Sequence, residues 1–192
     1  PMIIVLLNRV MNAKNISKVL LATTNREVDQ ELADIVEQRG FSVFKGDSKN
    51  LVKRYVDAVN LYKSDYVIRV TGDCPFVNSD LIEFCLDQVK NYDFDLATTK
   101  DSFPKGVDIE IYKADVLSNI YANISLTDDE KEHMLNYVYN NENEYKIIKI
   151  KPKKNWVSNK LFTVDNHTDL VRALKIIDKY GTSATIDEII GY

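Results

Sequence analysis

Two hydrophobic patterns alternate along the first hundred residues. Short apolar runs without a helical period predict buried strands. They lie at 18–23, 41–44, 66–71 and 95–99. Between them, apolar residues recur at roughly every 3.6 positions, which predicts helices. These segments lie at 1–11, 27–39, 50–63 and 79–90. Strands and helices that alternate over short connections predict a parallel sheet with helices on both faces.

The second half changes character at residues 107–112, where apolar and polar side chains alternate strictly. Such alternation predicts a strand with one solvent-exposed face, which is typical of an antiparallel addition to a sheet. Further strands are expected at 145–150 and 161–165, and further helices at 114–123, 128–140, 169–180 and 185–192. We therefore expect one three-layer α/β domain over residues 1–192, with a mostly parallel sheet and a small antiparallel extension.

Composition narrows the classes of function. The 192 residues are 45% hydrophobic and 28% charged, which is ordinary for a soluble globular domain. A net charge of -4 argues against non-specific binding to nucleic acid. No apolar run reaches the roughly 18 residues of a membrane span. Cys74 and Cys85 lack zinc-site spacing, so a reduced, cytoplasmic chain is expected.

Two aspartates share a context that suits metal binding. Asp73 follows the apolar strand over 66–71, and Asp165 ends the expected strand over 161–165. Ligands of open α/β sheets bind beyond the carboxyl ends of the strands. Two carboxylates brought together there would suit Mg²⁺, completed by phosphate oxygens and water. The alternative is that each aspartate caps a turn or the following helix.

Other polar residues are candidates for substrate contacts. Asp108 and Glu110 point the same way from one strand and could bind polyol hydroxyls, or they could form the solvent face of an edge strand. Arg54 and Arg69 could make forked contacts with phosphate. Arg54 lies on a helix surface, where an exposed charge is the more usual explanation, whereas Arg69 needs a partner because its strand is apolar. His133 lies within an expected helix, where a histidine usually has a structural role.

Four sequence motifs are more informative about function than the hydrophobic periodicity is. They are Arg69-Val-Thr-Gly-Asp-Cys-Pro75, Lys105-Gly-Val-Asp-Ile-Glu110, Glu132-His133 and Phe162-Thr-Val-Asp165. In this order and at these spacings, the chain resembles the cytidylyltransferases that activate acidic or modified sugars. It is most similar to the branch named after spore-coat polysaccharide biosynthesis, which is related to the CMP-sialic acid and CMP-KDO synthetases.

The resemblance implies a Rossmann-like nucleotide-diphospho-sugar transferase fold. It also implies transfer of CMP from CTP to a sugar acid or modified sugar for a surface polysaccharide, with Mg²⁺ held by Asp73 and Asp165. Thr23, Thr24 and Arg54 would lie near the nucleotide. The sugar side would be lined by Gly106, Asp108, Glu110 and His133. The region 104–145 resembles the family's dimerisation region, so a homodimer is expected.

The chain departs from the family pattern in three places. Such enzymes begin with a strand and a loop rich in Arg, Gly, Ser and Lys that holds the triphosphate, whereas this sequence opens in the helix at Pro1. We therefore expect the domain to be incomplete at its amino end, and the 192 residues alone to have little transferase activity. Met134-Leu135-Asn136 stands where relatives commonly carry Val-Thr-Pro, and His167 where they often have Pro.

Two other functions remain open from the sequence. A related nucleotidyltransferase could use another nucleotide or acceptor. A degenerate, non-catalytic domain could instead bind a nucleotide-sugar or a partner protein. The absent phosphate loop is the one sequence feature that favours this alternative, and truncation explains that absence more simply.

Overall fold

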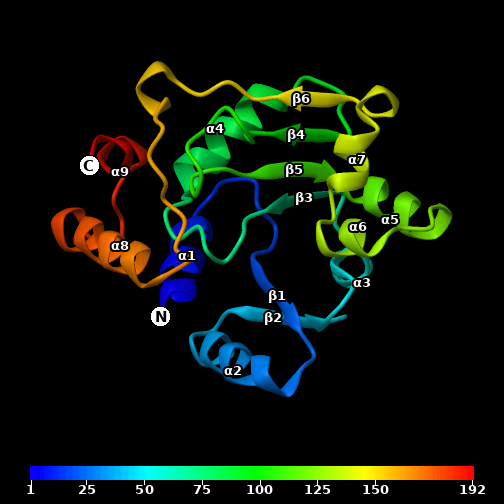
Figure 1. The fold of residues 1–192 in the computed structure, drawn as a ribbon, viewed down its shortest axis with the longest axis horizontal. Helices are drawn as coiled ribbons and strands as arrows, with labels where there is room; N and C mark the ends of the chain where they lie inside the picture. The colour runs from blue at the N-terminus through cyan, green and yellow to red at the C-terminus, as the bar shows by residue number, and fades with distance from the viewer.

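A computed structural model describes all residues from 1 to 192 (Figure 1). The strands are β1 (Leu20–Thr24), β2 (Ser42–Gly46), β3 (Tyr66–Arg69), β4 (Leu96–Thr98), β5 (Glu110–Lys113) and β6 (Ile147–Lys149). The helices are α1 (Met2–Val10), α2 (Gln30–Gln38), α3 (Leu51–Tyr62), α4 (Ser79–Val89), α5 (Ala114–Asn123), α6 (Asp128–Glu132), α7 (Asn136–Asn140), α8 (His167–Tyr180) and α9 (Ile186–Gly191). The expected order of strands and helices in the first half is confirmed.

The strands form two separate sheets. β1 and β2 make a parallel pair, and the other four strands are ordered β3-β5-β4-β6. β5 runs antiparallel to both of its neighbours, while β4 and β6 are parallel. Strands β3, β4 and β6 therefore share one direction, which confirms a mostly parallel sheet with an antiparallel element.

Helices cover both faces of the four-stranded sheet. On β4 and β5, Ala97 and Ile111 belong to one apolar core, and Leu96 and Tyr112 belong to another. This split follows from the two-residue period of a strand, which sends successive side chains to opposite faces. Helices α4, α8 and α9 contribute residues to the first core, and α3, α5 and α7 to the second. The arrangement confirms the three-layer α/β/α architecture (Figure 1).

Three local expectations are wrong. β5 lies in the interior of its sheet, so Glu110 is not on an edge strand. Residues 161–165 form no strand, because Phe162 and Val164 donate their backbone N–H groups to the loop carbonyls of Lys105 and Asp73, at 2.7 and 2.9 Å. The expected helix over 128–140 is broken into α6 and α7, since His133 leaves the helical conformation with φ -110° and ψ 77°.

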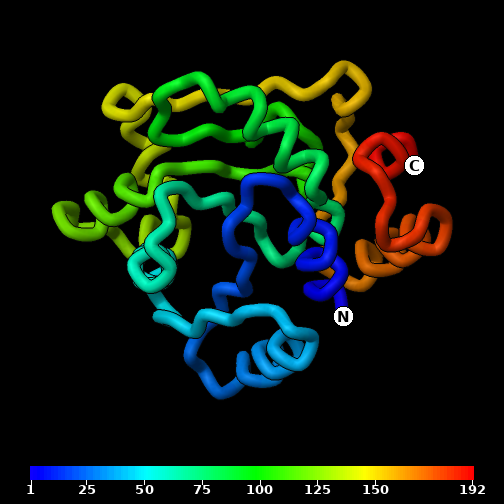
Figure 2. Tube along the Cα trace, turned by 180° about the vertical axis from the view of Figure 1, so that it is seen from behind, coloured from blue at the N-terminus to red at the C-terminus, as the bar shows by residue number.

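Arg9 of α1 fastens the amino-terminal helix to the carboxyl-terminal segment. Only 7% of its surface is exposed, and its guanidinium donates to four backbone carbonyls. These acceptors are Phe76, Val77, Thr182 and Ala184, at 2.9, 3.3, 2.7 and 2.8 Å. Burial lowers the pKa of Arg9 to about 10, so it remains charged at neutral pH. The contacts explain why the two termini lie on the same side of the molecule (Figure 2).

An apolar seam separates the two sheets. It is a cleft of about 700 Å³, lined by residues of α1, β1, α3 and β3. Each of β1 and β3 pairs with only one neighbour, so each has a free edge. No residue of β3 is fully buried, whereas all three residues of β4 are. None of the nine helices has the length and hydropathy needed to span a membrane.

Candidate functional site

A polar cleft of about 680 Å³ lies beyond the ends of β3 and β4. Its lining comes from the loop after β3, the loop after β4, the start of β5, the α6–α7 segment and residues 157–163. Polar residues predominate there, in contrast to the apolar seam. Ligands of open α/β sheets bind beyond the carboxyl ends of strands, so this cleft is the candidate site.

The loop after β3 brings Asp73 to the cleft. The backbone N–H of Cys74 donates to the carbonyl of Thr71 at 3.1 Å, which closes a tight turn around Asp73. The Thr71 hydroxyl and the Cys74 thiol are also hydrogen-bonded, 3.0 Å apart. Helix α4 follows at once, because Asn78 caps it by accepting from the N–H of Leu81 at 3.0 Å. Asp73 is therefore held on a short loop between two fixed elements.

Cys74 does not act as a nucleophile in this cleft. Its side chain is buried, and burial together with the charges of Asp73 and Asp108 raises the pKa of the thiol to about 12. The thiolate is the reactive form of cysteine, so the group stays unreactive at neutral pH.

Asp108 enters the cleft through a turn made by Gly106. The N–H of Gly106 donates to Oδ1 of Asp108 at 2.7 Å. Burial raises the pKa of Asp108, and the negative charges of Glu110 and Asp73 raise it further. The three carboxylates are thus electrostatic neighbours in one cleft.

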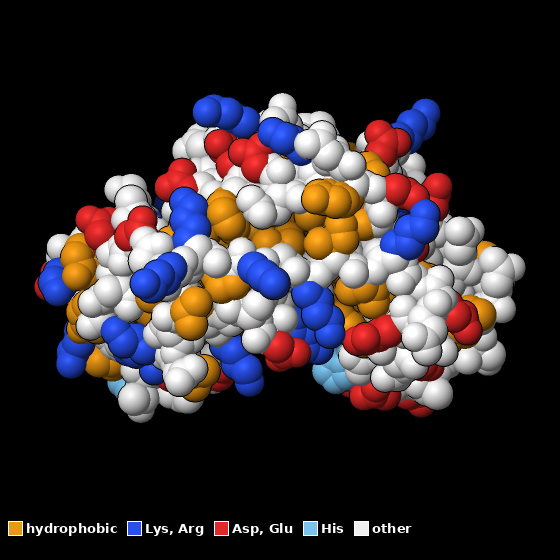
Figure 3. Space-filling model, turned by 90° about the horizontal axis from the view of Figure 1, so that it is seen from above, with side chains coloured by type: hydrophobic (Ala, Val, Ile, Leu, Met, Phe, Trp, Pro, Cys, Tyr) orange, Lys and Arg blue, Asp and Glu red, His pale blue; other side chains and the backbone are white.

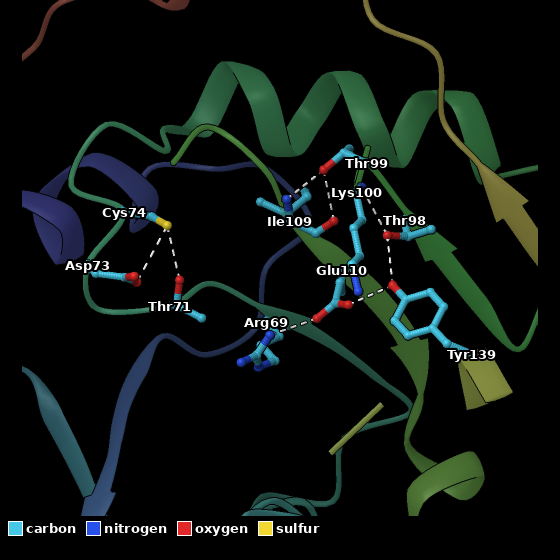
Figure 4. Close-up of polar contacts among 10 residues, drawn as sticks. All are labelled: Arg69, Thr71, Asp73, Cys74, Thr98, Thr99, Lys100, Ile109, Glu110 and Tyr139. Carbon is cyan, nitrogen blue, oxygen red and sulfur yellow. Dashed lines mark hydrogen bonds and ion pairs between the residues drawn. The ribbon is translucent and has the colours of Figure 1, made fainter. Parts of the chain in front are cut away.

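Arg69 and Glu110 neutralise each other on the wall of the cleft. Nη1 of Arg69 donates to Oε2 of Glu110 at 2.8 Å (Figure 4). The other carboxylate oxygen, Oε1, accepts from the hydroxyl of Tyr139 on α7 at 2.7 Å. The Tyr139 hydroxyl also lies 3.0 Å from Oγ1 of Thr98. The expectation that Arg69 needs a partner is confirmed, and the partner is Glu110.

Of the other two predicted sugar-side residues, His133 lines the cleft and Gly106 does not. His133 lines the cleft with 60% of its side chain exposed, 3.8 Å from Asp129. Gly106 has φ +90° and lets residues 162 and 163 cross it, since a Cβ there would lie 2.3 Å from their backbone. The chain crossing therefore leaves no room for a side chain at residue 106.

The predicted nucleotide residues gather elsewhere. Thr23 and Thr24 end β1, beside the end of β2, and Thr24 hydrogen-bonds to Asp29. Nε of Arg54 on α3 donates to the carbonyl of Asp47 at 2.9 Å. None of these three predicted residues lines the polar cleft, although all lie at the carboxyl ends of β1 and β2 or next to them. Their role toward a nucleotide stays a prediction.

Asp165, the predicted partner of Asp73 in metal binding, does not line the polar cleft. Val164 donates its N–H to the carbonyl of Asp73 at 2.9 Å, which brings the next residue, Asp165, to the same part of the fold. Carboxylate oxygens such as these fit Mg²⁺ when phosphate oxygens and water complete the shell. The protein alone gathers no group of three metal-binding side chains, so Mg²⁺ binding stays a prediction.

Sequence reasoning missed Lys100 and Tyr139. Lys100 follows the carboxyl end of β4, so the rule that pointed to Asp73 could have found it. Tyr139 reaches the cleft from α7 only because the helix over 128–140 is broken, and no local signal marks it. Positive and negative side chains both occur on the face of the molecule shown in Figure 3.

Comparison with known proteins identifies the family. The sequence model of the cytidylyltransferase family matches residues 1–186. The chain belongs to this family. It is 29% identical over 138 residues to the spore coat polysaccharide biosynthesis protein SpsF of Bacillus subtilis, covering 70% of this chain and 55% of SpsF. It is 28% identical over 148 residues to the uncharacterized protein MJ1063 of Methanocaldococcus jannaschii, covering 77% and 60%. The matches span less than two thirds of both relatives.

Solved structures of cytidylyltransferases share the fold. A cytidylyltransferase from Leptospira borgpetersenii is 26% identical, with a TM-score of 0.91 over 99% of this chain and 81% of that one. A CMP:2-keto-3-deoxy-manno-octonic acid synthetase complexed with CTP superimposes with a TM-score of 0.68 at 16% identity, over 93% of this chain and 88% of that one. The resemblance and the fold class predicted from the sequence are confirmed.

Proposed function

We propose that this cytidylyltransferase uses Mg²⁺ to transfer CMP from CTP to a sugar acid or modified sugar for a surface polysaccharide, as a homodimer that associates through residues 104–145. The observation that carries the proposal is the position of Asp73 in a polar cleft beyond β3, in a chain that matches the family over residues 1–186. The names of two similar proteins support a sugar acid or modified sugar as the acceptor: the spore coat polysaccharide biosynthesis protein SpsF and the CMP:2-keto-3-deoxy-manno-octonic acid synthetase.

In the proposed reaction, an acceptor oxygen attacks the α-phosphorus of CTP. A new P–O bond forms, the bond to the leaving pyrophosphate breaks, and the proton of an attacking hydroxyl passes to water. Mg²⁺, held by Asp73 and Asp165, would offset the negative charge that develops on the phosphate oxygens. Asp108 and Glu110 would accept hydrogen bonds from acceptor hydroxyls, and Lys100 would supply positive charge at the cleft. The protein's task is then to position the reactants and stabilise charge.

Pyrophosphate release by the full natural polypeptide tests the proposal. CTP, GTP, UTP and ATP are compared with Mg²⁺, using 2-keto-3-deoxy-manno-octonic acid and N-acetylneuraminic acid as probe acceptors. Asp73→Asn should reduce kcat with CTP by at least about 100-fold, since a metal-binding carboxylate is lost. Asp87→Asn, on the exposed side of α4, is the matched control and should retain activity.

Three results would contradict the proposal. Preference for another nucleotide would contradict the assignment of CTP. Asp73→Asn with unchanged turnover would contradict the role of that carboxylate. Nucleotide binding without turnover of any acceptor would favour a non-catalytic binding domain.

A further inference from the structure

Tyr139 contacts both charged side chains on one wall of the cleft. Its hydroxyl donates to Glu110, and its ring lies under Lys100, whose Nζ is 4.4 Å from the ring centroid (Figure 4). Lys100 makes no ion pair with a carboxylate, although Asp101 is its neighbour in sequence. A cation over a tyrosine ring is attracted by the ring's negative face. One side chain thus contacts an anion and a cation.

Donor and acceptor can be assigned in only one way in the hydrogen bonds around Tyr139. The backbone N–H of Lys100 donates to Oγ1 of Thr98 at 3.1 Å, so the Thr98 hydroxyl is free to donate to Tyr139. The single proton of the Tyr139 hydroxyl then goes to Oε1 of Glu110, which as a carboxylate only accepts. Because Arg69 occupies Oε2, both oxygens of Glu110 are fixed.

The loop that carries Lys100 is also fixed. Oγ1 of Thr99 donates to the carbonyl of Ile109 at 3.0 Å and accepts from the N–H of Ile109 at 2.7 Å. The hydroxyl of Ser102 donates to the carbonyl of Ile150 at 2.8 Å. These hydrogen bonds hold the backbone on both sides of Lys100. The contact with the ring of Tyr139 therefore sets the position of the flexible Lys100 side chain.

We propose that Tyr139 is a positioning residue that sets the places of Glu110 and Lys100 toward the acceptor substrate. This inference rests on the proposed function. Groups that bind substrate act best when neighbouring contacts lock their orientation before the substrate arrives. Tyr139 locks Glu110 through its hydroxyl and Lys100 through its ring, and these two effects can be separated by substitution.

The test uses Tyr139→Phe, which removes the hydroxyl and keeps the ring. Tyr137→Phe is the matched control, because Tyr137 lies on the same helix, packs against Tyr145 and makes no hydrogen bond through its hydroxyl. In the pyrophosphate assay with 2-keto-3-deoxy-manno-octonic acid, Tyr139→Phe should raise the KM for the acceptor about tenfold and change the KM for CTP less than about twofold. Lys100→Met should also raise the acceptor KM, whereas Tyr137→Phe should change neither.

A second measurement does not depend on turnover. The NMR signals of the Arg69 guanidinium report how firmly Glu110 is held. Tyr139→Phe should shift or broaden these signals, because one carboxylate oxygen loses its donor, and Tyr137→Phe should leave them unchanged. A purely packing role of the ring would not change them, since phenylalanine keeps the ring.

Unchanged Arg69 signals in Tyr139→Phe would overturn the proposal whether or not the enzyme turns over. Altered signals with an unchanged acceptor KM, or with equal increases in both KM values, would also overturn it. A wild-type protein without turnover contradicts the proposed function instead, and the NMR comparison then decides alone whether Tyr139 fixes Glu110.

Discussion

Arg69 on β3 donates to Glu110 on β5 at 2.8 Å, directly across the antiparallel pair that these strands form. The side chains are 25% and 13% exposed, so both charges have lost most of their hydration. Burial lowers the pKa of Arg69, but the neighbouring Tyr55 and Glu110 outweigh it, and the net shift is upward. The guanidinium therefore balances a protein carboxylate on the cleft wall.

Breaking this pair on one side should destabilise the fold. Arg69→Met leaves the charge of Glu110 without its cation, and we expect the free energy of unfolding to fall by about 3 kcal/mol. Urea unfolding measures the change. Lys53→Met is the control, because Lys53 and Asp57 form an ion pair with both side chains 38% exposed. Exposed pairs contribute about 0.5 kcal/mol. Equal effects of the two substitutions would contradict the prediction.

Arg9 should matter more for stability than any exposed arginine. Arg9→Met removes the donor for four carbonyls, three of which belong to the buried residues Phe76, Val77 and Ala184, and we expect a loss of about 3 kcal/mol or more, since unsatisfied buried acceptors are costly. Arg39→Met, at an exposed helix end, should cost less than about 0.5 kcal/mol. Both are compared by urea unfolding. If Arg9→Met unfolds at the wild-type midpoint, the four hydrogen bonds do not hold the termini together.

The layers of the fold could be predicted from sequence because their signals are local. Apolar periodicity identified the strand and helix order of the first half, including β1 and α4. The strand over 161–165 was wrong because Phe162 is buried in the core and Val164 packs against it, while the backbone of both bonds to loops. The local hydrophobic pattern indicates which residues are buried, but it does not indicate which backbone groups hydrogen-bond to one another.

The site could be predicted only where it follows a strand. Asp73 was found because the carboxyl end of β3 is visible in the sequence. Tyr139 could not be found, because its contact with Glu110 joins residues 29 positions apart and depends on the break between α6 and α7. The same holds for Gly106, where a chain that crosses it 56 residues later leaves no room for a side chain.

Gly106→Ala should be far more harmful than the same change at Gly40. Both glycines have positive φ, +90° and +81°, but only Gly106 has backbone within 2.3 Å of the added Cβ. Gly40→Ala should therefore cost about 1 kcal/mol for its conformation alone. Gly106→Ala should cost more than about 3 kcal/mol, because residues 162 and 163 must move. Thermal unfolding measures both. Similar unfolding midpoints for the two variants would show that residues 162 and 163 can move away at little cost in stability.

Asp108 should make stability depend on pH. Its pKa is raised in the folded protein, first by burial and then by Glu110 and Asp73. The folded state therefore binds this proton more tightly than the unfolded state. Its contribution to stability is fully present below the ordinary aspartate pKa of about 3.9 and is lost as pH rises through the raised value.

Asp108→Asn keeps an oxygen that can accept from Gly106 and removes the charge. At pH 7 the variant should unfold at a higher temperature than the wild type, and the difference should shrink as pH falls toward about 4. Turnover should fall at the same time, because the carboxylate faces the cleft. A difference in unfolding temperature that does not vary with pH would contradict the charge as its cause.

In the folded 192-residue chain, the apolar seam should bind a hydrophobic dye. Its lining is mostly apolar, and β1 and β3 leave their side chains only half buried there. We expect the fluorescence of 8-anilinonaphthalene-1-sulfonate to rise on adding the folded protein, since exposed apolar surface binds this dye. Leu20→Lys, in the seam, should reduce the signal, whereas Val157→Lys, 65% exposed and outside the seam, should not. Circular dichroism confirms that each variant is folded. An equal loss of dye binding in both variants would place the binding surface outside the seam.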